Sequence, residues 1–347
     1  MNMVENNPGS GPYRTVPIME PARKRTGRRA VFPLLSLSAL AGLVACERAA
    51  SPGAQVAQPG QPGQPGQSGQ PGQSGQPGQA ASSTSTNAPP TLQTDVVLTG
   101  LDTPWAIAFV PDRRVLITER SGRIRVVANG RLLPDPWMTL DAEETSEGGL
   151  MGLTLDPQFA ENRYVYAAYT TRTPQGQLQN RLVRLRDNPQ AGEAGSGVFD
   201  RALLESIPAA RVHDGARVKF GPDGKLYLTM GDAGSPDLAQ DPNALNGKIL
   251  RLNSDGSIPT DNPFRNSPVY SYGHRNPQGL AWQPGTGRLY ATEHGPSGGN
   301  PCCRDELNLI QPGSNYGWPT ITGDQTREGM VAPILSSGTS TTWAPAG

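Results

Sequence analysis

The chain has 347 residues, and its 30 basic and 30 acidic side chains give a formal net charge of zero. This balance provides no basic field that would attract phosphates, so we expect no nucleic-acid partner. The sequence contains three histidines, and each lies in a short motif with other polar residues, a pattern that suggests a reactive site.

Residues 1–46 have the order of a bacterial export signal. A basic segment at 23–29 precedes an apolar run, 30–44, that is too short to span a bilayer. The run leads into Leu43-Val44-Ala45-Cys46, which resembles a lipobox, in which the cysteine becomes the lipid-modified first residue. We therefore expect a lipoprotein-type signal that ends at Cys46. The mature protein would be exported to the periplasm or cell envelope and anchored to a membrane through Cys46, and a soluble secreted protein is the alternative.

Residues 47–93 have the composition of a tether. Between Gly60 and Gly78, glycine recurs at every third position with glutamine, proline and serine between. This repeat is too short for a stable collagen triple helix. Because such residues cannot bury enough apolar surface to offset chain entropy, we expect this segment to be disordered and to hold a folded domain away from the membrane.

From residue 94 onward, one theme returns four times: a turn with proline leads into a run of β-branched and aromatic residues. The four copies occupy 109–118, 155–166, 220–229 and 282–292. Such runs indicate strands, and repeats of this length indicate the blades of a β-propeller. An all-β sandwich would not explain why the same signature returns. We therefore predict an all-β fold in which residues 94–347 form a propeller domain.

The end of the chain falls within the repeat pattern. Residues 340–343 resemble the opening of another blade, and the sequence ends at Gly347. We therefore expect an incomplete propeller of about four blades plus the start of a fifth. An unclosed ring would expose strand edges, so the sequence leaves open whether such a chain is active.

The three histidines are His213 in Arg-Val-His-Asp-Gly-Ala-Arg, His274 in Tyr-Gly-His-Arg-Asn-Pro and His294 in Glu-His-Gly-Pro. Histidine is well suited to act as a general base near neutral pH. Its clustering here with Arg, Asn, Asp and Glu favours chemistry over a purely structural role. For Asp214, which lies within the first motif, and Asp232, which follows it, a turn-forming role is the expected one.

Several segments together resemble the soluble quinoprotein glucose dehydrogenases and the related aldose sugar dehydrogenases that depend on pyrroloquinoline quinone (PQQ). The segments are 103–106, 147–152, 213 with 220–224, 246–251, 272–279, 293–296, 305–308 and 315–319. The resemblance implies a six-bladed-type propeller with PQQ and calcium on its top face. It also implies an oxidoreductase that oxidises aldoses at C1 to lactones by hydride transfer to the quinone and passes electrons to an external acceptor.

The resemblance also implies roles for individual residues. His213 corresponds to the family's catalytic base, which takes the proton of the anomeric hydroxyl. Arg275 and Asn276 correspond to groups that contact the quinone, and the guanidinium would stabilise developing negative charge during catalysis. Glu147 stands where the glucose dehydrogenases have Gln, and it is expected to contact the cofactor. His274 and His294 are expected to be structural.

The expected calcium site is formed by the backbone carbonyls of Gly295 and Pro296, which suits a hard cation. The insertion Asn300-Pro301-Cys302-Cys303-Arg304 departs from the family pattern beside this site. The adjacent Cys302 and Cys303 are compatible with a vicinal disulfide in an oxidising compartment or with two free thiols.

Two other functions are compatible with the sequence. A calcium-dependent propeller lactonase also has a cation on its top face, although such enzymes usually use inward Glu, Asn and Asp side chains. A non-enzymatic binding propeller is the second alternative, because the family's further Lys and Arg contacts to the cofactor come from later blades than this sequence contains.

Overall fold

The computed structural model describes residues 93–296 and 302–347, which belong to one compact unit, Ala88–Gly347. The expected signal, its Cys46 and the tether up to residue 92 lie outside the described residues. No helix within 93–296 or 302–347 is long and apolar enough to cross a membrane.

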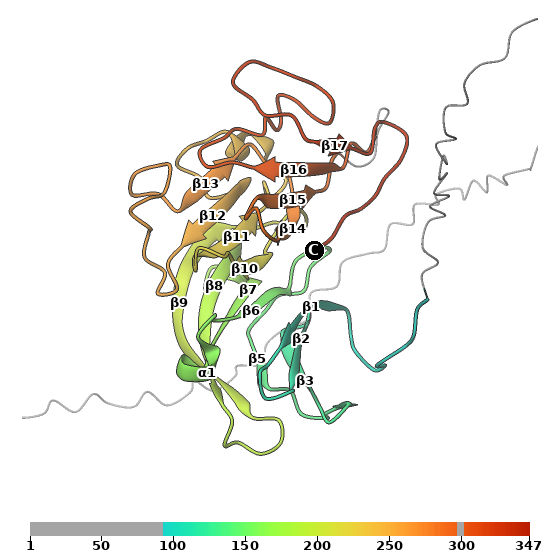
Figure 1. Cartoon of the computed structure of the whole chain (residues 1–347), viewed down its shortest axis with the longest axis vertical. Coiled ribbons are helices and arrows are strands. Elements are labelled where there is room, and N and C mark those ends of the chain that lie inside the picture. The colour runs from blue at the N-terminus through green and yellow to red at the C-terminus, as the bar shows by residue number, and fades with distance from the viewer. Residues whose placement is uncertain (1–92, 297–301) are drawn as a thin grey trace, which may run out of the picture. The chain divides into compact units, whose positions relative to one another are not determined.

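The described residues contain seventeen strands in four antiparallel sheets (Figure 1). The first sheet comprises β1 (Pro104–Phe109), β2 (Val115–Glu119), β3 (Arg123–Ala128), β4 (Arg131–Leu132) and β5 (Met138–Thr139). The second comprises β6 (Leu150–Leu155), β7 (Tyr164–Arg172), β8 (Leu178–Asn188) and β9 (Ser196–Pro208). The third comprises β10 (Val218–Phe220), β11 (Leu226–Met230), β12 (Lys248–Leu252) and β13 (Val269–Tyr272). The fourth comprises β14 (Pro277–Trp282), β15 (Leu289–Glu293), β16 (Glu306–Ile310) and β17 (Leu335–Ser336).

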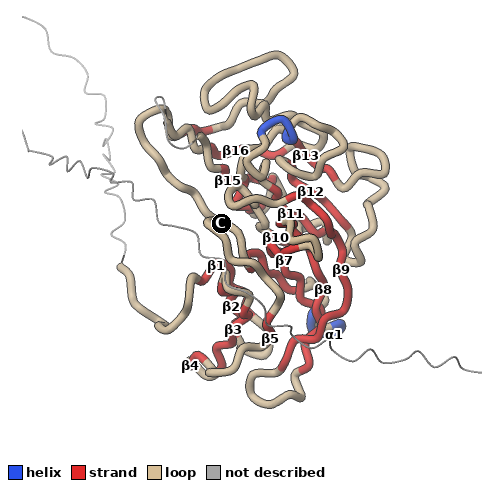
Figure 2. The backbone as a smooth tube through the Cα atoms, turned by 180° about the vertical axis from the view of Figure 1, so that it is seen from behind, coloured by secondary structure: helices blue, strands red, loops and turns tan. Residues whose placement is uncertain are grey.

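The strands of each sheet pair in the order of the chain, except that β5 pairs with β3 in the first sheet. This is the arrangement of propeller blades and confirms the prediction of an all-β propeller. Two short helical turns, α1 (Phe159–Asn162) and the 3₁₀ turn η1 (Pro236–Ala239), occur among the described residues, and Figure 2 shows them between strands and loops. Residues 340–343, expected to open a fifth blade, form no strand in the described structure.

The repeated turn of the sequence is the first hairpin of every sheet. In the third sheet, the turn from Gly221 to Lys225 joins β10 and β11, and the Asp223 carboxylate accepts a hydrogen bond from the Lys225 N–H at 3.1 Å. An aspartate that bonds the backbone two residues onward stabilises such a turn. The same aspartate contact occurs in the first sheet, from Asp112 to Arg114, and in the second, from Asp156 to Gln158. In the fourth sheet the Thr286 hydroxyl takes this place and accepts the Arg288 N–H.

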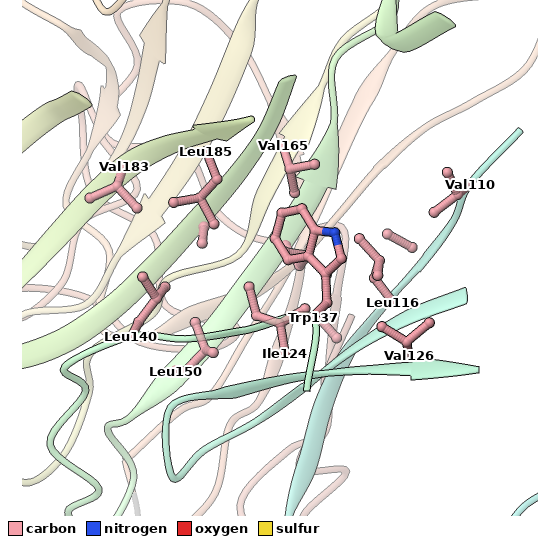
Figure 3. Packing of buried hydrophobic residues seen from close by; sticks show 14 of the residues in the cluster. Val110, Leu116, Ile124, Val126, Trp137, Leu140, Leu150, Val165, Val183 and Leu185 are labelled. Atoms are coloured by element: carbon pink, nitrogen blue, oxygen red, sulfur yellow. The ribbon is translucent and has the colours of Figure 1, made fainter. Parts of the chain in front are cut away.

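Hydrophobic clusters fill the spaces between successive sheets. The first cluster contains Trp137, Ile124 and Leu116 from one side and Leu150 and Leu185 from the other, as Figure 3 shows. Two further clusters lie between the second and third and between the third and fourth sheets. Because successive side chains in a strand point to opposite faces, one strand supplies two clusters. These clusters hold the loops that connect the sheets in place.

Candidate active site

His213 lies in the loop between β9 and β10, and its ring binds the carboxylate of Asp232, which follows β11. The His213 Nδ1 atom is 2.7 Å from Asp232 Oδ1. The Asp232 side chain is fully buried, whereas the His213 side chain is 16 % exposed. Among the described residues, the His213 ring is hydrogen-bonded at Nδ1 only. The ring is thus held at one nitrogen and open at the other.

The loop around His213 has an unusual backbone. His213 itself has φ 59°, in the left-handed region that residues other than glycine seldom adopt. A Cβ atom at Gly231 would collide with the His213 carbonyl oxygen, so only glycine permits this close approach of the two loops. Strained residues that the surrounding structure holds in place are often found at functional sites. This geometry therefore supports a role for His213 beyond packing.

The Asp232 carboxylate is held on both of its oxygens. Its Oδ2 accepts a hydrogen bond from the Trp318 indole at 2.8 Å, and its Oδ1 accepts one from the Gly234 N–H at 2.8 Å. An ionised carboxylate can only accept hydrogen bonds, so the His213 Nδ1 atom must carry the proton. The Nε2 lone pair is then free to receive a proton from a substrate.

The sequence predicts a turn-forming role for Asp232, and the structure adds a second one. Asp232 does shape a turn, since it accepts the N–H of Gly234 and its backbone carbonyl accepts that of Ser235. However, its carboxylate also binds His213. The sequence signal for this second role is the position of Asp232 just after β11, the strand that pairs with β10. A turn-forming aspartate would occupy the same position, so the signal does not distinguish the two roles.

Glu147 and Asn276 lie beside His213. The Glu147 carboxylate accepts a hydrogen bond from the His213 backbone N–H at 2.8 Å, and the Asn276 amide nitrogen lies 3.5 Å from the same carboxylate oxygen. The Asn276 side-chain oxygen accepts the Gly215 N–H at 3.2 Å. The structure therefore brings together three of the residues that the sequence singled out, from loops before β6, β10 and β14.

Arg275 contributes a buried positive charge on the same side. Its Nη1 atom donates to the His294 carbonyl at 3.0 Å, and its guanidinium lies 5.5 Å from the centre of the Trp318 ring. Burial lowers the pKa of Arg275, while the charges of Asp232, Glu293 and others oppose that shift. The Nη2 atom has no partner among the described residues, so it can donate to a bound group.

His274 has a structural environment. It is fully buried, its Nδ1 atom lies 2.8 Å from Glu293, its Nε2 atom lies 2.9 Å from Ser271, and its ring stacks on Tyr316. Glu293 also accepts the backbone N–H of Arg275. This network fixes the start of the Arg275-Asn276 loop.

Gly295 and Pro296 follow β15 and lie near Arg275. With Trp318, the three line one cavity of about 10 Å³, large enough for roughly a single water molecule. The Asp305 carboxylate accepts the Gly295 N–H at 2.9 Å and so positions this loop.

The calcium expected here fits the carbonyl groups at this position. The Gly295 carbonyl accepts no hydrogen bond from any residue that the structure describes, and the Pro296 carbonyl accepts one, from Cys303 at 2.8 Å. A Cβ atom at Gly295 would collide with the carbonyl oxygens of Cys303 and Arg304, so several such oxygens gather here. No group of three or more His, Cys, Asp or Glu side chains suited to a metal occurs in 93–296 and 302–347. A cation in this corner would thus bind backbone oxygens, as calcium can.

Cys302 and Cys303 form a disulfide in the structure. Of the two states that the sequence left open, this is the oxidised one. The disulfide lies at the base of the Gly295-Pro296 loop, because the Cys303 N–H is bound to Pro296.

Comparison with known proteins agrees with this geometry. Residues 101–347 match the family described as Glucose / Sorbosone dehydrogenase. An aldose sugar dehydrogenase of Escherichia coli is 34% identical over 71% of the chain and 67% of its own length. Quinoprotein glucose dehydrogenase B of Acinetobacter calcoaceticus is 34% identical over 68% of the chain and 54% of its own length. A protein of Synechocystis is 38% identical over 71% of the chain, and the chain covers 64% of that relative.

Solved structures show the same likeness. The PQQ-bound aldose sugar dehydrogenase of Streptomyces coelicolor has a TM-score of 0.63 and 37% identity over 70% of each chain. The apo-form of the soluble aldose sugar dehydrogenase of E. coli has a TM-score of 0.61 and 33% identity, over 68% of this chain and 72% of its own.

Proposed function

Because the chain belongs to the glucose/sorbosone dehydrogenase family, we propose that it is an oxidoreductase that oxidises aldose sugars at C1 to lactones, with PQQ and calcium as cofactors. The observation that carries the proposal is the pairing of His213 with Asp232, in a loop that Glu147 and Asn276 also contact. Trp318 links this pair to the buried Arg275, since its indole donates to Asp232 and its ring lies beneath the guanidinium.

His213 is the proposed base of this reaction. Its Nε2 atom accepts the proton of the anomeric hydroxyl, while Asp232 balances the positive charge that then forms on the ring. The C1–O bond gains double-bond character as the C1–H bond breaks and its electron pair leaves. PQQ, when bound, supplies the two-electron acceptor for that hydride.

Arg275 and Asn276 are the proposed contacts to the quinone. The free Nη2 atom of Arg275 would donate to an oxygen on which negative charge develops, and its low exposure strengthens that interaction. Glu147 would sit beside the cofactor and hold the His213 backbone. The carbonyls of Gly295 and Pro296 would hold calcium.

We propose that the protein acts outside the cytoplasm, tethered to a membrane by lipid at Cys46. The order of basic segment, apolar run and lipobox cysteine supports this. Its partners would be an aldose and an external electron acceptor, and the balanced charge makes nucleic acid an unsuitable one.

One experiment tests this function against the alternatives. Purified apo-protein is mixed with PQQ and calcium, and aldose-dependent reduction of an artificial dye is followed, with Arg131→Gln as an exposed control variant. Dye reduction that requires sugar and PQQ supports the proposal. Lactone hydrolysis that needs calcium but no quinone would indicate a lactonase, and neither activity would indicate a binding propeller.

A further inference from the structure

Trp318 contacts both the Asp232 carboxylate and the Arg275 guanidinium. Its indole N–H donates to Asp232 Oδ2 at 2.8 Å, and its ring lies beneath the Arg275 guanidinium at 5.5 Å. Asp232 in turn binds His213 through its other oxygen. Trp318 is thus the only described side chain that donates to the oxygen of Asp232 facing away from His213.

The backbone of Trp318 is fixed at both of its polar groups. Its N–H donates to the Gly273 carbonyl at 2.9 Å, and its carbonyl accepts from the Gln240 side chain at 2.7 Å. Gln240 also exchanges two hydrogen bonds with Asn315. Because Tyr316 bonds the backbone of β13, the segment that carries the indole is tied to the same sheet as Asp232.

Four charged groups lie around His213, including its partner Asp232. They are Asp232 after β11, Glu147 before β6, Asp214 next to His213 in the chain, and Arg275 before β14. Burial raises the pKa of Asp214 to about 6, so this carboxyl titrates in the same range as a histidine. An activity profile alone would therefore mix two titrations, and a useful test must observe the His213 ring itself.

We propose that Trp318 is a positioning residue for the base: its indole N–H holds the Asp232 carboxylate so that His213 carries its proton on Nδ1 and leaves Nε2 free. The hydrogen bond also withdraws charge from the carboxylate, which weakens the hold of Asp232 on a protonated His213 ring. Trp318 thereby favours the neutral His213 ring, whose Nε2 atom can accept a proton. The catalytic meaning of this effect rests on the function proposed above, whereas the effect on the ring does not.

The test is Trp318→Phe, which keeps an aromatic ring beneath Arg275 and removes the N–H. Loss of one hydrogen bond to a carboxylate should raise the pH midpoint of the His213 ring by about one unit. Nitrogen-15 NMR of histidine-labelled apo-protein reads this midpoint and the tautomer, and three histidines make assignment feasible. If sugar oxidation occurs, the acidic limb of its kcat/KM profile should move upward by the same amount.

The matched control is Trp137→Phe. Trp137 also donates its indole N–H to a buried carboxylate, Asp187, at 2.8 Å, but in the cluster between the first and second sheets. The Trp137→Phe variant should be destabilised about as much as Trp318→Phe, and the nitrogen-15 signals of its His213 ring should match those of the unmodified protein. A midpoint in Trp318→Phe that stays or falls, or a shift equally large in Trp137→Phe, would overturn the proposal.

The unmodified protein offers a second test if Trp318→Phe does not fold. Protonation of the His213 ring draws electron density of the Asp232 carboxylate toward His213 and so weakens the hydrogen bond that Asp232 accepts from the Trp318 indole. The Trp318 Nε1–H resonance should therefore shift with pH at the same midpoint as the His213 ring. The Trp137 Nε1–H resonance should not shift at that midpoint. A Trp318 resonance that shifts at a different midpoint from the His213 ring would refute the proposed link through Asp232. Absence of sugar oxidation with these NMR results intact would reject the proposed function and leave the positioning role standing.

Discussion

Replacing Asp232 by asparagine should disable the base while leaving the fold largely intact. The carboxylate accepts three donors: the Trp318 indole, the Gly234 N–H and the His213 ring. An asparagine has one oxygen and one NH₂ group in their place. If its oxygen faces Trp318, its NH₂ group faces His213 and forces the ring into the tautomer whose Nε2 atom already carries a proton.

The opposite orientation of the asparagine keeps the ring tautomer but leaves the Trp318 donor facing an NH₂ group. Either way one buried donor loses its acceptor, which costs about 1–3 kcal/mol and should lower Tm by roughly 3–10 °C for a domain of this size. Because a wrongly protonated ring cannot accept a proton, kcat/KM should fall by about 10²–10⁴-fold. Dye reduction and thermal melting measure the two effects separately.

The control for Asp232→Asn is Asp223→Asn. Asp223 lies in the turn between β10 and β11, where it binds Arg251 and the Tyr227 hydroxyl. This variant should lose stability without a comparable loss of turnover per folded molecule. A folded Asp232→Asn protein that retains more than about a tenth of the original kcat/KM would refute the role of the pair.

Two further outcomes are expected. His213→Ala should reduce turnover by about 10²–10⁴-fold and leave PQQ binding, followed by absorbance titration, close to that of the unmodified protein; a loss below tenfold would remove His213 as the base. Cys46→Ala should move the processed protein from the membrane fraction to the soluble fraction, because the lipid at Cys46 is the proposed anchor, and a mutant recovered with membranes would place the anchor elsewhere.

The blade architecture could be predicted because its signal is local. Each proline-containing turn and the run after it lie within one hairpin, so nearby residues determine that hairpin. The turn at Gly221 to Lys225 illustrates this, since Asp223 bonds a backbone group two residues away. Four such hairpins then predict four sheets, and the structure confirms them.

The site was only partly predictable because its contacts join distant segments. His213 and Arg275 stood out through their residue types and motifs. Asp232 lies 19 residues from His213, and Trp318 lies 86 residues from Asp232. Only the pairing of β10 with β11 and the return of the chain after β16 bring these side chains together. The oxidation of adjacent cysteines likewise depends on surroundings that their spacing does not reveal.

The loop that carries Gly295 should depend on pH through Asp305. The carboxylate binds the N–H groups of Gly295, Trp343 and Ala344 and the Thr342 hydroxyl. Burial acts to raise the pKa of Asp305, but these hydrogen bonds outweigh it and the net pKa is lowered.

A carboxyl group whose pKa is lower in the folded than in the unfolded protein stabilises the fold at pH values above its unfolded pKa of about 4. This contribution is lost as the pH falls through the folded pKa. Asp305→Asn should therefore melt below the unmodified protein at pH 7, and the difference should shrink in melts at progressively lower pH below about 4. A difference in Tm that stays constant over that range would show that the charge of Asp305 contributes nothing to holding this loop.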